Sequence, residues 1–220
     1  MKCTVITPIG PGHSRLFDDC RRSVEQGMAH SRGPFSEIVH LAVDDTRGAL
    51  GRSVARNAAV AKAVREGADW LFFLDADDVL VEDAFARVED HVDRYDAIWG
   101  SIYELKKNAT RPHIRAGQDV PIRTVDDVLR MDPALSLQMG HFVRGAVARH
   151  TRFDVRLDAG EDFDYYLRVW HRYRCLKLPH PLFMNRRGMR SKGPRSASAA
   201  AWRRLALMII ARFAEKQRMT

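Results

Sequence analysis

The sequence predicts an α/β fold in which helices flank a mostly parallel central sheet. Two observations carry this prediction: three strand–helix units follow one another in the first half, and each helix places apolar residues at helical spacing. Consecutive units of this kind form parallel sheets with right-handed crossovers. The 220 residues suffice for one large domain.

Strands and helices alternate regularly in the first half. Strands are expected at residues 3–7, 38–43 and 70–74, and helices at 16–28, 53–66 and 81–93. The third strand, WLFFL, has no polar position and therefore reads as buried on both faces.

The second half is less regular. Strands are expected at 97–102, 142–143, 175–178 and 182–184, helices at 124–131, 160–173 and 199–218, and a loop or hairpin at 106–120. A Gly/Ser/Arg-rich mobile loop is expected at 186–198, with Arg186, Arg187 and Arg190 placed to close over an anionic group.

Acidic residues follow two of the expected strands. Asp44 and Asp45 end the second strand, and Asp75, Asp77 and Asp78 end the third. Ligands bind beyond the carboxyl ends of parallel strands, so these acids should converge on one edge of the sheet. Carboxylates there suit a divalent cation. The alternative is a solvated acidic turn in which Asp78 caps the next helix.

Two further groups have residue types suited to chemistry. Glu161 and Asp162 open an amphipathic helix, where a carboxylate projecting into a cleft serves as a general base. Acids in a first helical turn are also favoured by the helix dipole alone. Arg52 and Arg56, with Asn57, begin the second helix, a position suited to phosphate, although a solvent-facing ion pair explains a basic residue equally well.

Charge is concentrated at the C-terminal end. Residues 186–220 hold ten Lys or Arg and one acid, whereas the rest holds 26 bases and 27 acids. This basic tail suits phosphate groups, an anionic membrane surface or nucleic acid, or it is simply a basic surface helix. The three cysteines are few and widely spaced, which favours a reducing compartment. A cytoplasmic protein is expected, with peripheral contact at the inner membrane face as a further option for residues 199–220.

Several familiar motifs do not fit. There is no phosphate-binding P-loop and no nucleophile elbow. Gly10 and Gly12 begin like a dinucleotide fingerprint, but Arg15 stands where the third glycine is needed.

Taken together, five segments in order resemble the family 2 glycosyltransferases, which have the GT-A fold, a Rossmann-type sandwich. The segments are VITPIG, LAVDD, SVARNAAV, WLFFLDADDVL and FVRGAVARHTRFDVRLDAGEDFDYYLRVW. The resemblance departs from the family after the first strand, where Ile9 and Gly10 replace a polar and aromatic pair, and after LAVDD, where Thr46-Arg47-Gly48 replaces a Gly-Ser turn.

The resemblance implies a transfer of a sugar from a nucleotide-diphosphate sugar to an acceptor hydroxyl, with inversion at the anomeric carbon. It implies a nucleotide-binding half at 1–104, an acceptor half at 105–198 and an appended basic helix at 199–220. Lipid-linked saccharides, proteins and small natural products are the acceptor classes it leaves open, and nucleic acid is not expected.

The resemblance also implies roles for single residues. Asp77, supported by Asp75, would hold Mg²⁺ or Mn²⁺, and Asp162 would be the general base with Glu161 orienting the acceptor. The implied nucleotide-sugar contacts are Pro8, Asp44, Asp45, Arg56, Asp75 and Ala76. The implied diphosphate loop carries Arg186, Arg187 and Arg190.

Two rival functions remain. The segment Asp75-Ala76-Asp77-Asp78-Val79 also resembles the nucleophile strand of haloacid-dehalogenase phosphohydrolases, but that strand normally comes first in the chain, and here two strand–helix units precede it. A membrane-surface or nucleic-acid binder would use the basic tail, but it leaves the acidic strand ends unexplained.

Overall fold

The chain forms two sheets in the computed structural model, which describes residues 1–106, 109–157, 159–187 and 199–218. The larger sheet has the strand order β2 (Glu37–Asp44), β1 (Lys2–Ile9), β3 (Trp70–Phe73), β8 (His141–Arg144), β5 (Ala97–Trp99) and β9 (Cys175–Lys177). The smaller sheet has the order β4 (Val79–Leu80), β10 (Phe183–Arg187), β6 (Tyr103–Lys106) and β7 (His113–Ile114). The predicted α/β class is confirmed.

The larger sheet is mostly parallel, as expected. β1 pairs in parallel with β2 and β3, and β5 with β9, whereas β8 runs antiparallel to β3 and β5. In the β1–β2 ladder Asp44 lies opposite Ile9, and in the β1–β3 ladder Phe73 lies opposite Ile6. The acid-bearing ends of β2 and β3 therefore lie at the same edge of the sheet.

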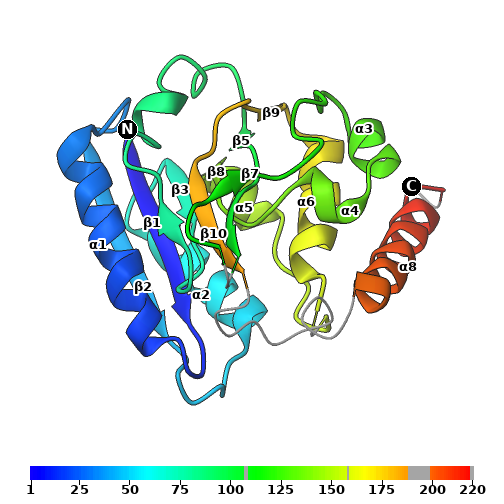
Figure 1. Ribbon diagram of the computed structural model, residues 1–220, viewed down its shortest axis with the longest axis horizontal. Coiled ribbons are helices and arrows are strands. Elements are labelled where there is room, and N and C mark those ends of the chain that lie inside the picture. The colour runs from blue at the N-terminus through cyan, green and yellow to red at the C-terminus, as the bar shows by residue number, and fades with distance from the viewer. Residues whose placement is uncertain (107–108, 158, 188–198, 219–220) are drawn as a thin grey trace.

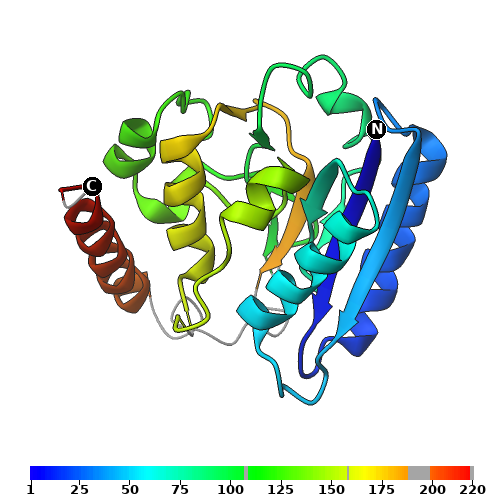
Figure 2. The same cartoon turned by 180° about the vertical axis from the view of Figure 1, so that it is seen from behind.

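Helices cover both faces of this sheet (Figures 1 and 2). The helices are α1 (Ser14–His30), α2 (Arg52–Arg65), α3 (Val125–Arg130), α4 (Pro133–Ser136), α5 (Gly145–His150), α6 (Glu161–Arg172) and α8 (Ala199–Arg218). α1 packs on one face and α2 on the other. β3 serves both cores, because Leu71 and Phe73 point to the α2 side while Trp70 and Phe72 point to the α1 side. The absence of any polar position in WLFFL follows from this.

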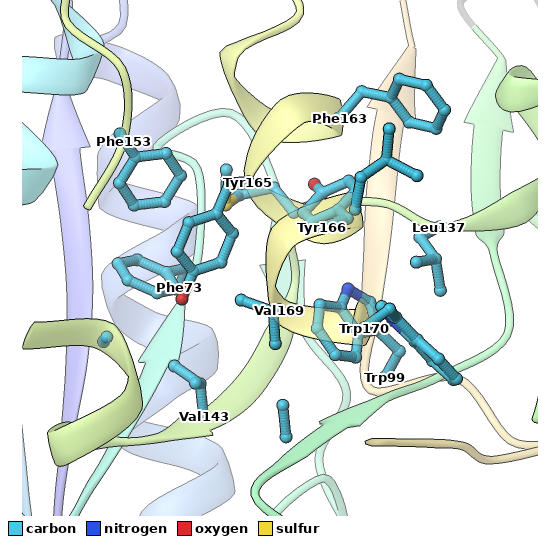
Figure 3. Close-up of a cluster of buried hydrophobic side chains, with 14 of the residues drawn as sticks. Phe73, Trp99, Leu137, Val143, Phe153, Phe163, Tyr165, Tyr166, Val169 and Trp170 are labelled. Carbon is cyan, nitrogen blue, oxygen red and sulfur yellow. The ribbon is translucent and has the colours of Figure 1, made fainter. Parts of the chain in front are cut away.

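The larger core lies between the sheet and α6 and is rich in aromatic rings (Figure 3). Trp99 stacks on His141 with ring centroids 4.3 Å apart, and Phe153 stacks on Tyr165 at the same distance. Stacking of this kind adds stability beyond the area that it buries. The core thereby fixes α6, and with it the acids at its first turn.

The C-terminal helix α8 is part of this core. Trp202, Ala206, Ile209 and Phe213 are buried and pack with α6 in the larger cluster. Arg203 bonds to Asp132 and Arg212 to Asp154, which ties α8 to the body of the chain at two points. None of the helices in the described residues is long and apolar enough to span a membrane.

One predicted helix is wrong. Residues 81–93 form turns and a single 3-10 helix, Ala86–Val88. Phe85, Val88 and Val92 do point into the smaller core at helical spacing, which explains the prediction. However, i→i+3 bonds, such as Ala84 N–H to the Val81 carbonyl, interrupt the i→i+4 ladder, so no regular α-helix forms.

The mobile loop expected at 186–198 falls only in part on the described residues. Arg186 and Arg187 belong to β10, where they pair with Leu105 and Lys106 of β6, so the loop assignment is wrong for these two residues. Arg190 and the rest of 188–198 lie outside the described residues. The expected hairpin at 106–120 is confirmed as β6–β7, and the expected helix at 124–131 is α3, with a Thr124 capping box.

Asp154 should contribute to stability in a pH-dependent way. Hydrogen bonds from Arg156 and then Arg212 hold the pKa of Asp154 far below its usual range. A depressed acid pKa contributes stability that is present above the unfolded value of about 3.9 and is lost as the pH falls toward the folded value. We expect Asp154→Asn to lower the free energy of unfolding by about 1 kcal/mol at pH 7.

Urea denaturation at a series of pH values measures this effect. The difference between wild type and Asp154→Asn should shrink below pH 4 or so. Glu215→Gln, which changes an exposed acid of α8, is the matched control and should leave stability nearly unchanged. A deficit in Asp154→Asn that stays constant down to low pH would contradict the assignment.

Candidate active site

Three carboxylates meet at the end of β3. After Phe73 the chain makes a turn in which the Asp78 N–H donates to the Asp75 carbonyl, and β4 begins at Val79. Ligand oxygens of Asp75, Asp77 and Asp78 all lie within 4.8 Å of one another. Ala76, between them, is buried. The turn therefore brings three acids together where the sequence predicted a metal site.

The pKa values of the three acids reflect their crowding. Burial, and then the charges of its neighbours, raises the pKa of Asp77, and the same causes raise that of Asp78 further. Burial also acts to raise the pKa of Asp75, but the Arg56 guanidinium outweighs it, so the net shift is downward. Carboxylate oxygens are the ligands that hard divalent cations prefer, so this donor set fits Mg²⁺ or Mn²⁺.

Asp78 differs from the other two acids in its partners. The Asn185 side-chain amide donates to both of its oxygens, at 3.0 and 3.2 Å, and the Arg186 backbone N–H donates at 3.1 Å. Its carboxylate thus joins the acidic turn to β10. Asp75 and Asp77 remain the better candidates for direct metal contact.

Arg56 links the acidic turn to the second pair of acids. Its side chain is buried, with Nη2 2.5 Å from Asp75 Oδ1 and Nη1 2.9 Å from Glu161 Oε1. Arg52, one helical turn earlier, approaches the same Glu161 oxygen at 3.7 Å but is half exposed. One guanidinium therefore holds the end of β3 and the start of α6 in fixed relation.

Asn57 fastens the segment that leads into α6. Its amide donates to the Phe153 carbonyl and accepts from the Phe153 N–H, both at 2.9 Å. The Arg56 side chain also lies over the Phe153 ring, 5.4 Å from its centroid. The Ala-Arg-Asn segment thus orders both the acids and the loop before them.

Glu161 and Asp162 occupy the first turn of α6, with different exposure. Glu161 is buried, and burial followed by the Asp162 charge raises its pKa despite Arg56. Asp162 is partly exposed, and its Oδ1 accepts from the Phe163 N–H at 2.8 Å. Of the two, Asp162 is the carboxylate more accessible from solvent.

Gly160 sets the position of this turn. Its φ of +72° lies in the left-handed region, and a Cβ there would come within 2.5 Å of Ile209 Cδ1 in α8. Glycine is therefore required both by the backbone conformation and by the close approach of α8.

The two acids at the end of β2, Asp44 and Asp45, have different surroundings. Both carboxylate oxygens of Asp45, which is buried, accept backbone N–H groups, from Leu50 and Gly51 at 2.9 and 2.8 Å. Asp44 is exposed, and its Oδ1 accepts from the Thr46 N–H. Asp45 shapes the loop that leads into α2, whereas Asp44 faces solvent near Pro8, which pairs with Val43.

The predicted arginines of the diphosphate loop have different surroundings. The Arg186 guanidinium bonds to the Asp77 carbonyl, to Asp19 at 2.8 Å and to the Leu16 carbonyl at 3.0 Å, and the residue is buried. Arg186 therefore braces the acidic turn against α1. The backbone of Arg187 continues β10.

Two contributors were missed from the sequence. Asn185 gave no local signal, because its partner Asp78 lies 107 residues away. His13, in the turn after β1, exerts a smaller pKa-lowering effect on Asp75 and Asp77 than the causes named above. Its place in the short connection between the end of β1 and the start of α1 was the available signal.

Removal of the Arg56 charge should destabilise the fold. In Arg56→Met, Glu161 keeps its burial and loses its closest cation, and breaking a buried ion pair in this way costs about 3 kcal/mol or more. Arg52→Met is the matched control, because it removes a half-exposed arginine that faces the same carboxylate, and should cost less than about 1 kcal/mol. Chemical denaturation of both variants checks this, and equal losses would contradict the buried bridge.

The fold is similar to that of known glycosyltransferase structures. S. aureus TarS 1–349 superposes with a TM-score of 0.62 at 16% identity, over 84% of this chain and 60% of TarS 1–349. Its complex with UDP-GlcNAc gives 0.63 at 15% identity, over 90% and 61%. Glucosyl-3-phosphoglycerate synthase from Mycobacterium tuberculosis, in complex with Mg²⁺ and UDP, gives 0.51 at 12% identity, over 95% and 78%. The chain thus spans about 60% of the length of TarS 1–349, and no curated protein sequence matches it.

A sequence family matches the part of the chain that contains the acidic turn. The model of glycosyl transferase family 2 matches residues 23–142, more than half of the chain. The matched stretch includes Asp44, Arg56 and the acids from Asp75 to Asp78, whereas Pro8, Glu161 and Asp162 lie outside it. With the match and the GT-A architecture in agreement, the chain belongs to glycosyl transferase family 2.

Proposed function

We propose that this protein transfers a sugar from a nucleotide-diphosphate sugar to an acceptor hydroxyl, with inversion of the anomeric carbon. The observation that carries the proposal is the pair of ion pairs that Arg56 makes with Asp75 and Glu161. They join an acidic turn with metal-binding residue types to the two acids at the start of α6. Donor activation and acceptor deprotonation would then occur side by side.

Asp77 and Asp75 would hold a divalent cation at the donor diphosphate. When bound, Mg²⁺ or Mn²⁺ would neutralise the charge that develops on the departing nucleoside diphosphate. The UDP complexes of TarS and of the mycobacterial synthase, the latter with Mg²⁺, support a donor of this class.

Asp44 would contact the nucleotide base, with Pro8 beside it. Its carboxylate is exposed at the sheet edge, whereas the two oxygens of Asp45 are engaged by backbone donors. Arg56 would act on the donor indirectly, by holding Asp75.

Asp162 would act as the general base. It would accept the proton of the acceptor hydroxyl as that oxygen forms its bond to the anomeric carbon and the bond to the diphosphate oxygen breaks. Attack from the side opposite the leaving group inverts that carbon. Glu161, fixed by Arg56, would orient the acceptor and keep α6 in place.

Neither rival function accounts for these contacts as well. A haloacid-dehalogenase nucleophile at Asp75 is not favoured by the family match. A binder that depends on a separate basic tail is not favoured either, since the apolar stripe of α8 is buried in the core.

Nucleotide binding should depend on the metal and on Asp77. We expect UDP, GDP or TDP to raise the melting temperature in the presence of Mn²⁺, because a ligand that binds only the folded state stabilises it. Asp77→Asn should lose the metal-dependent part of the rise. Asp90→Asn, at an exposed acid, is the control. A rise of equal size in Asp77→Asn would contradict the metal assignment.

Loss of Asp162 should separate binding from turnover. Asp162→Asn should retain the nucleotide-dependent thermal shift but transfer sugar at least about 10²-fold more slowly, because removal of a general base costs that much or more. Asp126→Asn, which changes an exposed acid in the first turn of α3, controls for the helix dipole. Transfer at wild-type rate in Asp162→Asn would remove Asp162 from the mechanism.

A further inference from the structure

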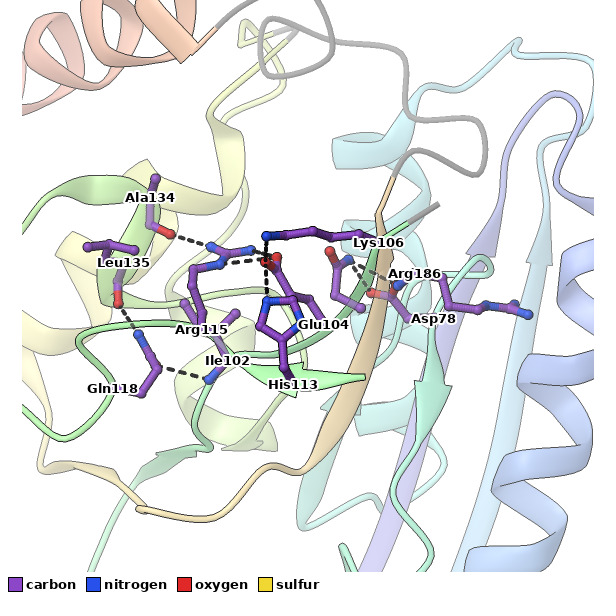
Figure 4. A network of polar contacts seen from close by, with 11 residues as sticks. Asp78, Ile102, Glu104, Lys106, His113, Arg115, Gln118, Ala134, Leu135 and Arg186 are labelled. Atoms are coloured by element: carbon purple, nitrogen blue, oxygen red, sulfur yellow. Dashed lines mark hydrogen bonds and ion pairs between the residues drawn. The ribbon is translucent and has the colours of Figure 1, made fainter. Parts of the chain in front are cut away.

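A second charged cluster lies on the β6–β7 hairpin (Figure 4). Glu104 of β6 is buried, and its Oε2 accepts from Arg115 Nη2 and Nε at 2.7 and 3.2 Å. Its Oε1 lies 3.3 Å from His113 Nε2 and 4.0 Å from Lys106 Nζ. Three basic side chains thus converge on one carboxylate.

The basic side chains of this cluster exceed what Glu104 needs. Two donors from Arg115 already satisfy one of its oxygens, and Arg115 also donates to the Ala134 carbonyl, which fixes it in place. Lys106 and His113 are 59% and 42% exposed, so the Lys106 ammonium and the His113 ring are accessible to a ligand from solvent. Glu104 therefore anchors the cluster without neutralising it.

The segment that follows Glu104 adds no further acid up to residue 118. Residues 105–118, LKKNATRPHIRAGQ, hold no Asp or Glu, and neither do residues 186–204. β6 and β10 are parallel neighbours, with the backbone of Lys106 opposite that of Arg187. Burial, and to a smaller extent the Arg115 charge, lowers the pKa of Lys177 to about 8.

The cluster lies beside the acidic turn and is distinct from it. In the smaller sheet β10 separates β6 from β4, which directly follows Asp78. Two strand spacings amount to roughly 10 Å. Asn185 and Arg186 of β10 hold Asp78, and Figure 4 places Asp78 and Arg186 on one side of β10 and the basic cluster on the other. An anion held here would be a neighbour of the donor diphosphate.

We propose that Lys106 and His113, backed by Arg115, bind a phosphate group carried by the acceptor. A phosphate monoester carries more than one negative charge and several acceptor oxygens, and therefore suits convergent cationic donors. This inference rests on the proposed transferase function, and it gives the acceptor a chemical class: a phosphorylated hydroxyl compound.

Inorganic phosphate is the first probe, and the His113 imidazole is the reporter. NMR spectra of the full-length protein at constant pH and ionic strength, with the His113 resonances assigned from His113→Gln, should show a saturable shift as phosphate is added. Lys106→Gln should weaken this binding about threefold, the effect of one exposed charge pair. Arg149→Gln, at an exposed arginine of α5, should leave it unchanged. An unmoved His113 resonance, or equal affinity in Lys106→Gln, would overturn the site.

A pair of acceptors tests the role in transfer. A sugar phosphate and its unphosphorylated parent, assayed with the same donor, should differ in KM, and Lys106→Gln should raise KM for the phosphorylated acceptor alone while kcat is kept. Equal KM values for the pair in the wild-type enzyme would refute the acceptor class.

The two proposals fail in distinguishable ways. Phosphate binding at His113 requires no turnover, so it can be observed even if no nucleotide binds at Asp77. In that case the transferase proposal fails. Metal-dependent nucleotide binding without a His113 response leaves the transferase standing and removes the phosphate site.

Discussion

The site depends on one buried ion pair system, the Arg56 guanidinium between Asp75 and Glu161. Burial of a charged group costs several kcal/mol, and an excellent geometry with two carboxylates is what offsets that cost here. Because Asp75 follows β3 and Glu161 begins α6, segments from the two halves of the sequence are held together by one side chain. A bridge of this kind is a weak source of net stability and a strong constraint on geometry.

The sequence predicted the parts of this arrangement that are local. The apolar run WLFFL predicted β3, and the acids after β2 and β3 predicted a common sheet edge, because parallel strands end together. The helix at 81–93 was wrong because apolar spacing reports which residues face the core and does not report whether the i→i+4 bonds are unbroken. Arg186 was assigned to a loop because Gly/Ser/Arg composition cannot reveal pairing with β6.

Long-range contacts account for the rest. The Asp78–Asn185 and Arg56–Glu161 contacts each join residues more than 100 positions apart, so no short motif contains both members. The division of labour between Asp44 and Asp45 likewise needed the structure, because adjacent acids look alike in a sequence and differ only in the donors that meet them. The residue types in the sequence indicated the kind of chemistry. The fold determined which of the neighbouring acids is accessible and which is engaged by other protein groups.

The contact between Gly160 and Ile209 gives the C-terminal helix a structural role that its basic composition does not indicate. α8 rests against the backbone at the start of α6 so closely that no side chain fits between them. Ile209 and Leu205 of α8 occupy the space beside Gly160 and so restrict outward movement of the turn that bears Glu161 and Asp162. A substitution at Leu205 or Ile209 would therefore act on the position of Glu161 and Asp162 through the backbone at Gly160.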